Sequence, residues 1–251
     1  KARGGGQLRM GLVKLEEREW LQPAPDLAAR AAGFADWPQA VQLTPEVDAP
    51  GRELAAMLGV GGALPEAGLA VHEDLCLLTQ REGEEVYRLI GAAVAWPSDW
   101  HPAEKIGLPL RALHAPIAGY EEQLATGVDR FMETLRPGAI YGRCNWFIAA
   151  TGERRWLPDR PPQEAFAHVT PDNAGETLFV RSERQTLRRL PQTGAILFTI
   201  GIYVEPLGNL SPSNIAMLGK AVQTLVSGEG DRRGAPAYAD SLIAFAERNA
   251  A

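Results

Sequence analysis

The stretch that decides the fold runs from Glu176 to Val204 and reads ETLFVRSERQTLRRLPQTGAILFTIGIYV. Its two ends, residues 176–184 and 195–204, contain many β-branched and aromatic residues, which favour strands. Before the second of them, Gln192-Thr193-Gly194 is typical of a turn. The stretch therefore predicts two strands close together in the second half of the chain.

Strand signals also occur upstream of this stretch. Residues 75–80 and 86–90 flank a polar turn at residues 81–84, which is typical of a β-hairpin. Residues 144–150 (CNWFIAA) predict another strand. The sequence thus predicts a sheet built from hairpins rather than from strands that alternate with helices.

Two helices are predicted with most support from the pattern. The segment 119–135 carries one apolar stripe, made of Leu124, Val128, Phe131, Met132 and Leu135. The segment 211–226 begins with Ser211 as its N-cap and Pro212 in the first turn. Shorter helices are predicted over residues 26–33, 50–58 and 240–248. Strands gathered around a helical middle indicate an α+β fold with an antiparallel sheet.

The composition narrows the class of protein. The chain has 251 residues, of which 45% are hydrophobic and 22% are charged, so it can form a globular core. A net charge of −6 argues against nucleic acid as the main partner, which would need a basic face. Because the sequence contains no apolar run of about 18 residues, we expect no membrane span.

The cysteines and the N-terminus bear on localisation. Cys76 and Cys144 are too few for a disulfide framework, which fits a reducing compartment. No apolar region follows Lys1, so we expect a flexible leader over residues 1–9 rather than a signal peptide. We therefore expect a cytoplasmic protein. Common phosphate-loop, zinc-protease, hydrolase and dinucleotide motifs are missing from the sequence.

Four histidines, His72, His101, His114 and His168, are candidate metal ligands. A lone histidine is more often structural than functional. His114 differs from the others because it ends an apolar stretch and precedes Ala115-Pro116-Ile117. That setting would desolvate the ring and leave one nitrogen exposed to a pocket.

The arginine-rich run 181–191 allows two interpretations. Alternation along a strand would place Arg181, Glu183 and Gln185 on one face and Arg184 and Arg188 on the other. The run is then either a solvated ladder of salt bridges, or a clamp in which arginines bind a carboxylate and Glu183 complements a cationic substrate. Composition alone favours the ladder.

Three segments together change this balance. They are residues 96–120, which include WPSDW, EKIGLPL and LHAPIAGY; the strand start with Arg143, Asn145 and Trp146; and residues 181–200. Their order and wording resemble the haem-dependent oxidative N-demethylase family over about residues 10–226. The run ERQTLRRLP at 183–191 is long and unusual, so it is a specific signal.

The resemblance implies a PAS-like haem domain over residues 10–226, with an antiparallel sheet and helices packed around a haem pocket, followed by a loop and short helix at 227–251. Since no CxxCH motif occurs, haem b would be bound noncovalently. The implied activity is oxidative N-demethylation of a small methylated amine such as dimethylamine, using O₂. Electrons from NADPH would arrive through reductase subunits that carry FMN and a [2Fe–2S] cluster, and tetrahydrofolate would accept the formaldehyde.

The resemblance also implies roles for single residues. His114 becomes the expected proximal iron ligand, with His168 as second choice. Glu183 would hold the substrate ammonium. Together with Glu183, Arg181 is the expected catalytic residue. The remaining candidates would bind haem propionates, polarise O₂ or line the pocket: Arg184, Arg188, Lys105, Asn145 and Trp146.

Two departures from the family pattern put the substrate, or even catalysis, in doubt. Ile117-Ala118 stands where the family favours Val-Pro, and Gly201 stands where an arginine is expected. Two alternatives to an enzyme therefore stay open: a PAS-like haem sensor of O₂ or another small ligand, and a scaffold that has lost its haem. A sensor normally carries an output domain, and the sequence after Val226 shows none.

Overall fold

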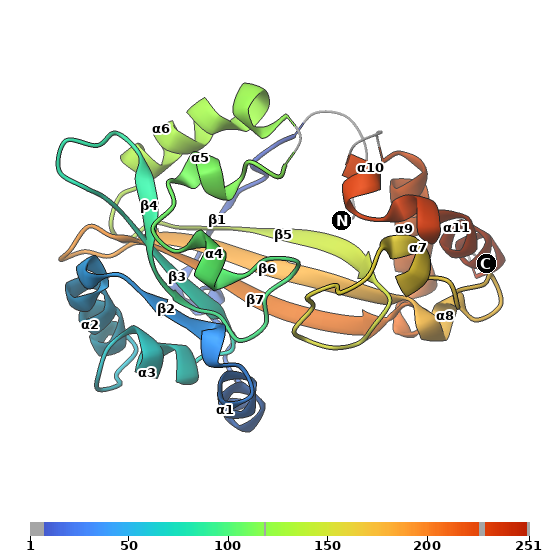
Figure 1. Ribbon diagram of the computed structural model, residues 1–251, viewed down its shortest axis with the longest axis horizontal. Helices are drawn as coiled ribbons and strands as arrows, with labels where there is room; N and C mark the ends of the chain where they lie inside the picture. The colour runs from blue at the N-terminus through green and yellow to red at the C-terminus, as the bar shows by residue number, and fades with distance from the viewer. Residues whose placement is uncertain (1–7, 118, 226–228, 250–251) are drawn as a thin grey trace. The chain divides into compact units, whose positions relative to one another are not determined.

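The computed structural model of the protein describes residues 8–117, 119–225 and 229–249 (Figure 1). Contacts divide the chain into two compact units. The larger unit contains residues 9–144 and 183–202, and the smaller unit contains residues 145–182 and 203–251 together with the N-terminal residues before 9. This division does not test the predicted boundaries at residues 10, 226 and 227, which stay a prediction.

A seven-stranded sheet has the strand order β1-β5-β6-β7-β3-β4-β2 among the described residues. The pairs β1–β5, β2–β4, β3–β4 and β3–β7 are antiparallel. The strands are β1 (Val13–Leu15), β2 (Val41–Leu43), β3 (Asp74–Gln80), β4 (Tyr87–Ala93), β5 (Ile140–Ala149), β6 (Phe179–Arg189) and β7 (Ile196–Pro206). The predicted α+β class with an antiparallel sheet is confirmed, and the arrangement is consistent with a PAS-like fold.

Both units contain helices. Those of the larger unit are α1 (Leu27–Ala35), α2 (Asp48–Met57), α3 (Leu64–Leu69), α4 (Pro102–Lys105), α5 (Leu110–Leu113) and α6 (Thr126–Thr134). Those of the smaller unit are α7 (Pro162–Ala165), α8 (Ala174–Thr177), α9 (Pro212–Gln223), α10 (Glu229–Arg232) and α11 (Ala239–Arg248).

In the larger unit, the sheet is apolar on both faces. Along β3, Leu75 and Leu77 pack into one core with residues of α2 and α3, whereas Cys76 and Leu78 belong to clusters on the other face. Successive side chains of a strand point to opposite faces, so this short apolar run is covered on both sides. Figure 1 shows α1–α3 on one side of these strands and α4–α6 on the other.

One close approach depends on a glycine in β4. A Cβ atom at Gly91 would lie 2.3 Å from Val47 Cγ2 and 2.7 Å from Leu64 Cδ2. Helix α3 and the turn before α2 therefore sit directly on the β4 backbone. A side chain at this position would push both away from the sheet.

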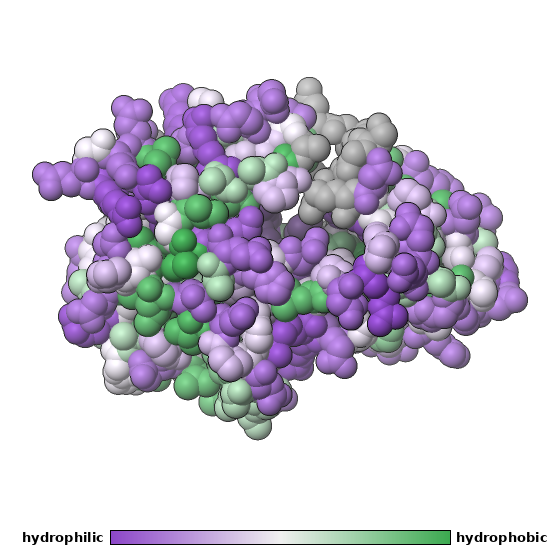
Figure 2. All heavy atoms as spheres, in the orientation of Figure 1, coloured by the Kyte–Doolittle hydropathy of each residue, from purple (hydrophilic) through white to green (hydrophobic). Residues whose placement is uncertain are grey.

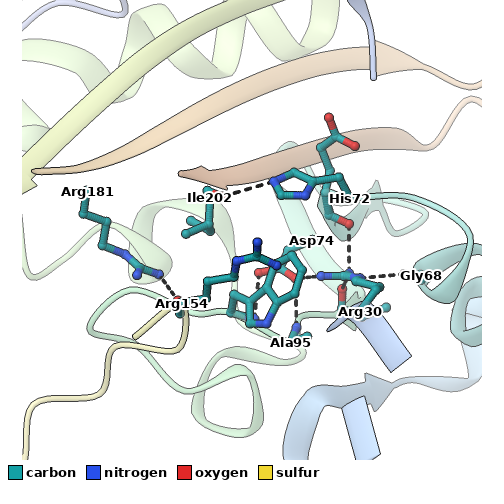
Figure 3. A network of polar contacts seen from close by, with 11 residues as sticks. Arg30, Gly68, His72, Asp74, Ala95, Arg154, Arg181 and Ile202 are labelled. Carbon is teal, nitrogen blue, oxygen red and sulfur yellow. Dashed lines mark hydrogen bonds and ion pairs between the residues drawn. The ribbon is translucent and has the colours of Figure 1, made fainter. Parts of the chain in front are cut away.

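A buried ion pair fixes α1 against the strands (Figure 3). Arg30 Nη1 donates to Asp74 Oδ1 at 2.6 Å, and Arg30 Nε donates to the Gly68 carbonyl at 2.8 Å. Asp74 Oδ1 also accepts a hydrogen bond from the backbone N–H of Ala95, and Oδ2 accepts one from the backbone N–H of Trp96. The polar partners named here lie within the larger unit, where they join a helix to the ends of β3 and β4.

The smaller unit has its own apolar core. The predicted helix at 211–226 is observed as the shorter α9, which ends at Gln223, while Val226 lies outside the described residues. Ser211 is its N-cap, and Ile215, Leu218 and Val222 are buried as expected. Helix α11 packs against α9 through Leu242. The C-terminal helix thus belongs to the same compact unit as α9.

Other element predictions need correction at their bounds. The strand predicted from Glu176 begins at Phe179, because residues up to Thr177 form the one-turn helix α8. The same strand runs on to Arg189, so residues 181–189 of the arginine-rich run are extended. The helix predicted over 119–135 contains a π-helical turn, Glu121–Ala125, before α6. Helices α3, α4, α5 and α7 had no prediction, and α10 lies in a segment that was predicted to be a loop.

The surface shown in Figure 2 is largely hydrophilic, with apolar groups scattered between polar ones. Large exposed apolar side chains are Val13, Leu27, Leu43, Leu69 and Tyr203. Such scattered residues are ordinary on a protein surface and need no partner. In the described part of the chain, no helix is long and apolar enough to cross a membrane.

Candidate functional site

The histidine favoured by the sequence lies at the C-terminal end of α5. His114 Nδ1 is 2.9 Å from the carbonyl oxygen of Leu110, one turn earlier. A carbonyl oxygen only accepts hydrogen bonds, so Nδ1 carries the ring proton. Nε2 is then the basic nitrogen. This arrangement, with one ring nitrogen bound to a carbonyl, is typical of metal-ligating histidines.

A tyrosine holds the other side of the imidazole. The rings of His114 and Tyr120 are stacked, with centroids 4.4 Å apart and planes within 10° of parallel. Together with the bond to the Leu110 carbonyl, the stacking fixes the rotation of the imidazole. The Tyr120 hydroxyl is buried and has no hydrogen-bond partner among the described residues. Burial, with a contribution from Asp129, raises the pKa of Tyr120 to about 12, so this group stays protonated.

The segment that carries His114 is tied to the following helices. Arg111 of α5 forms ion pairs with Glu121 in the π-helical turn and with Asp129 of α6, the latter at 2.7 Å. A π-helical turn inside an α-helix is rare and occurs frequently at functional sites. Here it follows Tyr120 directly.

Burial lowers the pKa of His114 below its usual value of 6.5, and the positive charges of Arg143 and Lys105 lower it further. The bond to Leu110 acts in the opposite direction but is the smaller effect. The imidazole is therefore neutral at pH 7, as a metal ligand must be.

A chain of three polar side chains lies on β5 and β6. Arg143 Nε donates to Gln185 Oε1 at 2.7 Å, and Gln185 Nε2 donates to Glu183 Oε2 at 2.8 Å. Arg143 also donates to the Met10 carbonyl. Glu183 and Gln185 are both buried. Burial lowers the pKa of the Arg143 guanidinium, while the nearby charge of Glu183 opposes that shift.

The larger unit thus brings together five groups of complementary chemistry: His114, Tyr120, Arg143, Lys105 and Glu183. Their electrostatic coupling links a neutral imidazole to two cations and one carboxylate. Sequence reasoning singled out His114, Lys105 and Glu183 but gave no role to Tyr120 or Arg143. Both belong to segments that carried the resemblance, so their position was the available signal.

The remaining arginines of β6 in this unit make other contacts. Arg184 Nη1 donates to the Trp20 carbonyl, and Arg188 pairs with Glu17 at 2.8 Å while stacking on the Trp20 ring at 4.0 Å. The alternation predicted for the strand is thus observed, with Gln185 bound to Glu183 on one face and these arginines on the other. Their role at haem propionates stays a prediction.

Three predicted site residues belong to the smaller unit. Arg181 donates to the carbonyls of Glu153 and Arg154 (Figure 3). Asn145 and Trp146 are contacted by Arg233, which binds the Trp146 carbonyl and lies 5.5 Å from the Trp146 ring.

Sequence reasoning did not find Arg233, because it lies 87 positions from Trp146 in a segment that was predicted to be a loop. The functional roles predicted for Arg181, Asn145 and Trp146 are not tested by these contacts.

The other histidines have different surroundings. His72 is buried, with Nε2 3.1 Å from the Ile202 carbonyl (Figure 3). His101 lies edge-on to Trp37, and the side chain of His168 is exposed. His114 is therefore better placed than His168 to hold an iron ion away from solvent.

Of the two departures from the family pattern, the structure describes the one at Gly201 but not the one at Ala118. Gly201 lies buried in β7, so an arginine there would need a buried counter-charge. Ala118 lies outside the described residues.

A family model described as haem-dependent oxidative N-demethylase, alpha subunit-like, matches residues 45–242. The chain belongs to this family. The family predicted from the sequence is thus confirmed. The family's description names a haem-dependent oxidoreductase activity, oxidative N-demethylation, and indicates one subunit of a larger enzyme.

The residues of the larger unit fit a haem. A haem iron would need a protein side chain as its ligand, and His114 offers a neutral ring with one nitrogen already bound to a carbonyl. The buried Tyr120 hydroxyl, without a partner in the described residues, is a donor that a bound group would satisfy. The described residues contain no group of three or more histidine, cysteine or acidic residues that would hold a bare metal ion.

Proposed function

We propose that this chain is the haem-binding subunit of an enzyme that demethylates a small methylated amine, similar to dimethylamine, with O₂ and electrons from a reductase partner. The observation that carries the proposal is the His114 imidazole, fixed by the Leu110 carbonyl and the Tyr120 ring and kept neutral by burial. The family's description supports the class of reaction.

In this proposal, His114 Nε2 holds the iron of a noncovalent haem b, and Lys105 of α4 is a cation for a propionate. Lys105 is half-buried and close enough to influence the His114 pKa. Haem, when bound, supplies the activation of O₂. Arg181, Arg184, Arg188, Asn145 and Trp146 remain in the proposal as further haem or oxygen contacts, on the resemblance alone.

Glu183 is proposed to bind the substrate as an ammonium ion. Its carboxylate is buried, and a buried anion is costly unless a cation or hydrogen-bond donors compensate it. A dialkylammonium ion offers both a charge and two N–H donors. Holding the amine in one place turns oxidation of its methyl group into an intramolecular step.

The overall reaction balances with one reductant. Dimethylamine, O₂, NADPH and a proton give methylamine, formaldehyde, NADP⁺ and water, so one C–N bond breaks and two electrons come from NADPH. We propose that these electrons arrive through partner subunits carrying FMN and a [2Fe–2S] cluster, and that tetrahydrofolate accepts the formaldehyde.

The test is the visible spectrum of the purified chain, oxidised and reduced, after haem is added. Wild type is expected to show a Soret band, and His114→Ala is expected to lose or strongly shift it. His168→Ala, at an exposed histidine, is the matched control and is expected to match wild type. An unchanged band in His114→Ala would refute the ligand assignment.

Formation of formaldehyde is the second part of the test. With dimethylamine and a reductase supplied, the haem-loaded chain is expected to produce it. A chain that binds haem but gives no product with methylated amines would favour the sensor. A chain that takes up no haem would leave only the scaffold.

A further inference from the structure

Arg143 of β5 and Gln185 and Glu183 of β6 form a chain of hydrogen bonds, and this chain determines which atom of each side chain is donor and which is acceptor. Arg143 donates to Gln185 Oε1, and a guanidinium has only donors. The amide of Gln185 is therefore oriented unambiguously, with its oxygen toward Arg143. Its NH₂ group faces Glu183 and donates to Oε2 at 2.8 Å.

This amide stands between two opposite charges. Arg143 and Glu183 form no ion pair within the described residues, although the charge of Glu183 opposes the lowering of the Arg143 pKa by burial. Without Gln185, the long guanidinium could turn toward the carboxylate and pair with it directly. The Gln185 amide is uncharged, so it gives Glu183 a hydrogen bond without neutralising its carboxylate.

Glu183 is left half satisfied as a result. Oε2 accepts the bond from Gln185, whereas Oε1 accepts none from the described part of the chain. The residue as a whole is only 7% exposed, yet Oε1 is not one of the fully buried atoms without a partner, so it can be reached from solvent. A carboxylate held in a largely buried position with one accessible oxygen suits a small cation that carries N–H groups.

We propose that Gln185 is a positioning residue that keeps Glu183 available for an alkylammonium ligand by separating it from Arg143. The inference rests on the proposed function, because it takes the Glu183 ligand to be the amine substrate. It adds a determinant of specificity: the spacer makes the site prefer a cation to a neutral molecule of the same size.

The experiment measures amine binding by the haem-loaded chain. Dimethylammonium chloride is titrated calorimetrically, and 2-propanol serves as a neutral molecule of similar size. Gln185→Met keeps the side-chain length but removes both hydrogen bonds. It is expected to weaken dimethylammonium binding about tenfold or more, which is the loss expected for a hydrogen bond to a charged group. Gln42→Met, on β2, is the matched control and is expected to bind like wild type.

A second variant separates positioning from general disruption. In Arg143→Met/Gln185→Met, the competing cation is gone, so Glu183 is free again. The double variant is expected to bind dimethylammonium more tightly than Gln185→Met alone. Equal or weaker binding by the double variant would overturn the inference, as would wild-type affinity in Gln185→Met.

The outcomes also distinguish the inference from the proposed function. If Glu183→Gln loses amine binding while Gln185→Met keeps it, the substrate site stands and only the spacer is refuted. If wild type with haem binds no dimethylammonium, both are overturned. If the Met variant does not fold, Gln185→Asn is used: it is one methylene shorter, cannot span both bonds, and is expected to show the same loss.

Discussion

The replacement Arg30→Met tests whether a buried ion pair holds α1 on the sheet. Arg30 and Asp74 are 0% and 1% exposed at their side chains, and their charged atoms are 2.6 Å apart. The guanidinium also donates to the carbonyls of Gly68 and Glu73 at 2.8 and 2.9 Å. Methionine has a similar length but offers none of these donors.

The loss in the free energy of unfolding can be worked out from the buried groups that lose a partner in Arg30→Met. Asp74 keeps its bonds from the N–H groups of Ala95 and Trp96 but loses its only counter-ion among the described residues. Removing one partner of a buried pair costs about 3–5 kcal/mol, because the other charge stays buried and uncompensated. Two buried carbonyls also lose a donor, so we expect a value toward the upper end of this range. That is a large part of the total stability of about 5–15 kcal/mol typical of a protein.

Urea unfolding of the two purified proteins measures this difference. The matched control is Arg52→Met, because Arg52 and Asp48 form an ion pair whose side chains are 62% and 61% exposed. Exposed pairs contribute about 0–1 kcal/mol, so the control is expected to unfold almost like wild type. A loss in Arg30→Met within about 1 kcal/mol of the control would refute the view that this network anchors α1.

Three further predictions concern the site and its support. Tyr120→Phe keeps the ring that stacks on His114 and removes only the hydroxyl, so it is expected to change the haem spectrum less than Tyr120→Leu, which removes the ring. Equal changes in both variants would contradict the role of the ring. Glu53→Gln removes the negative charge that accepts hydrogen bonds from the backbone N–H groups of Gln192 and Thr193 in the β6–β7 turn. The free energy of unfolding, measured in urea, is expected to fall by about 1–3 kcal/mol. An unchanged free energy of unfolding, as for a substitution at the surface, would contradict this role of Glu53. Because burial lowers the pKa of His114 in the folded state, the unfolded chain binds more protons below about pH 6.5, so the free energy of unfolding of the apo chain is expected to fall there. His114→Gln should reduce this fall between pH 7.5 and 5.5, and equal falls in both proteins would count against it.

The predictable parts of the fold were those set by local pattern. The hairpin of β3 and β4 and the helix α9 follow from alternation, turn residues and an N-cap, all of which act within a few residues. The one-turn helices α4 and α5 were missed because four residues are too few to show a helical period. The π-helical turn before α6 was missed because its sequence also suits an ordinary α-helix.

In the candidate site, the sequence pattern predicted the face on which a side chain lies but not the residue that it contacts. Period-two alternation correctly separated Glu183 and Gln185 from Arg184 and Arg188. It could not show that Gln185 binds Arg143, because those two residues are 42 positions apart and meet only when β5 and β6 pair.

A local rule assigns a side chain to a face, and only the pairing of distant strands decides what it meets there. In this protein, the partner that Glu183 meets decides between two possible roles of its carboxylate. Bonded directly to an arginine, Glu183 would be a neutralised structural residue. Held by an amide instead, it keeps one carboxylate oxygen without a partner among the described residues, as the proposed ammonium site requires.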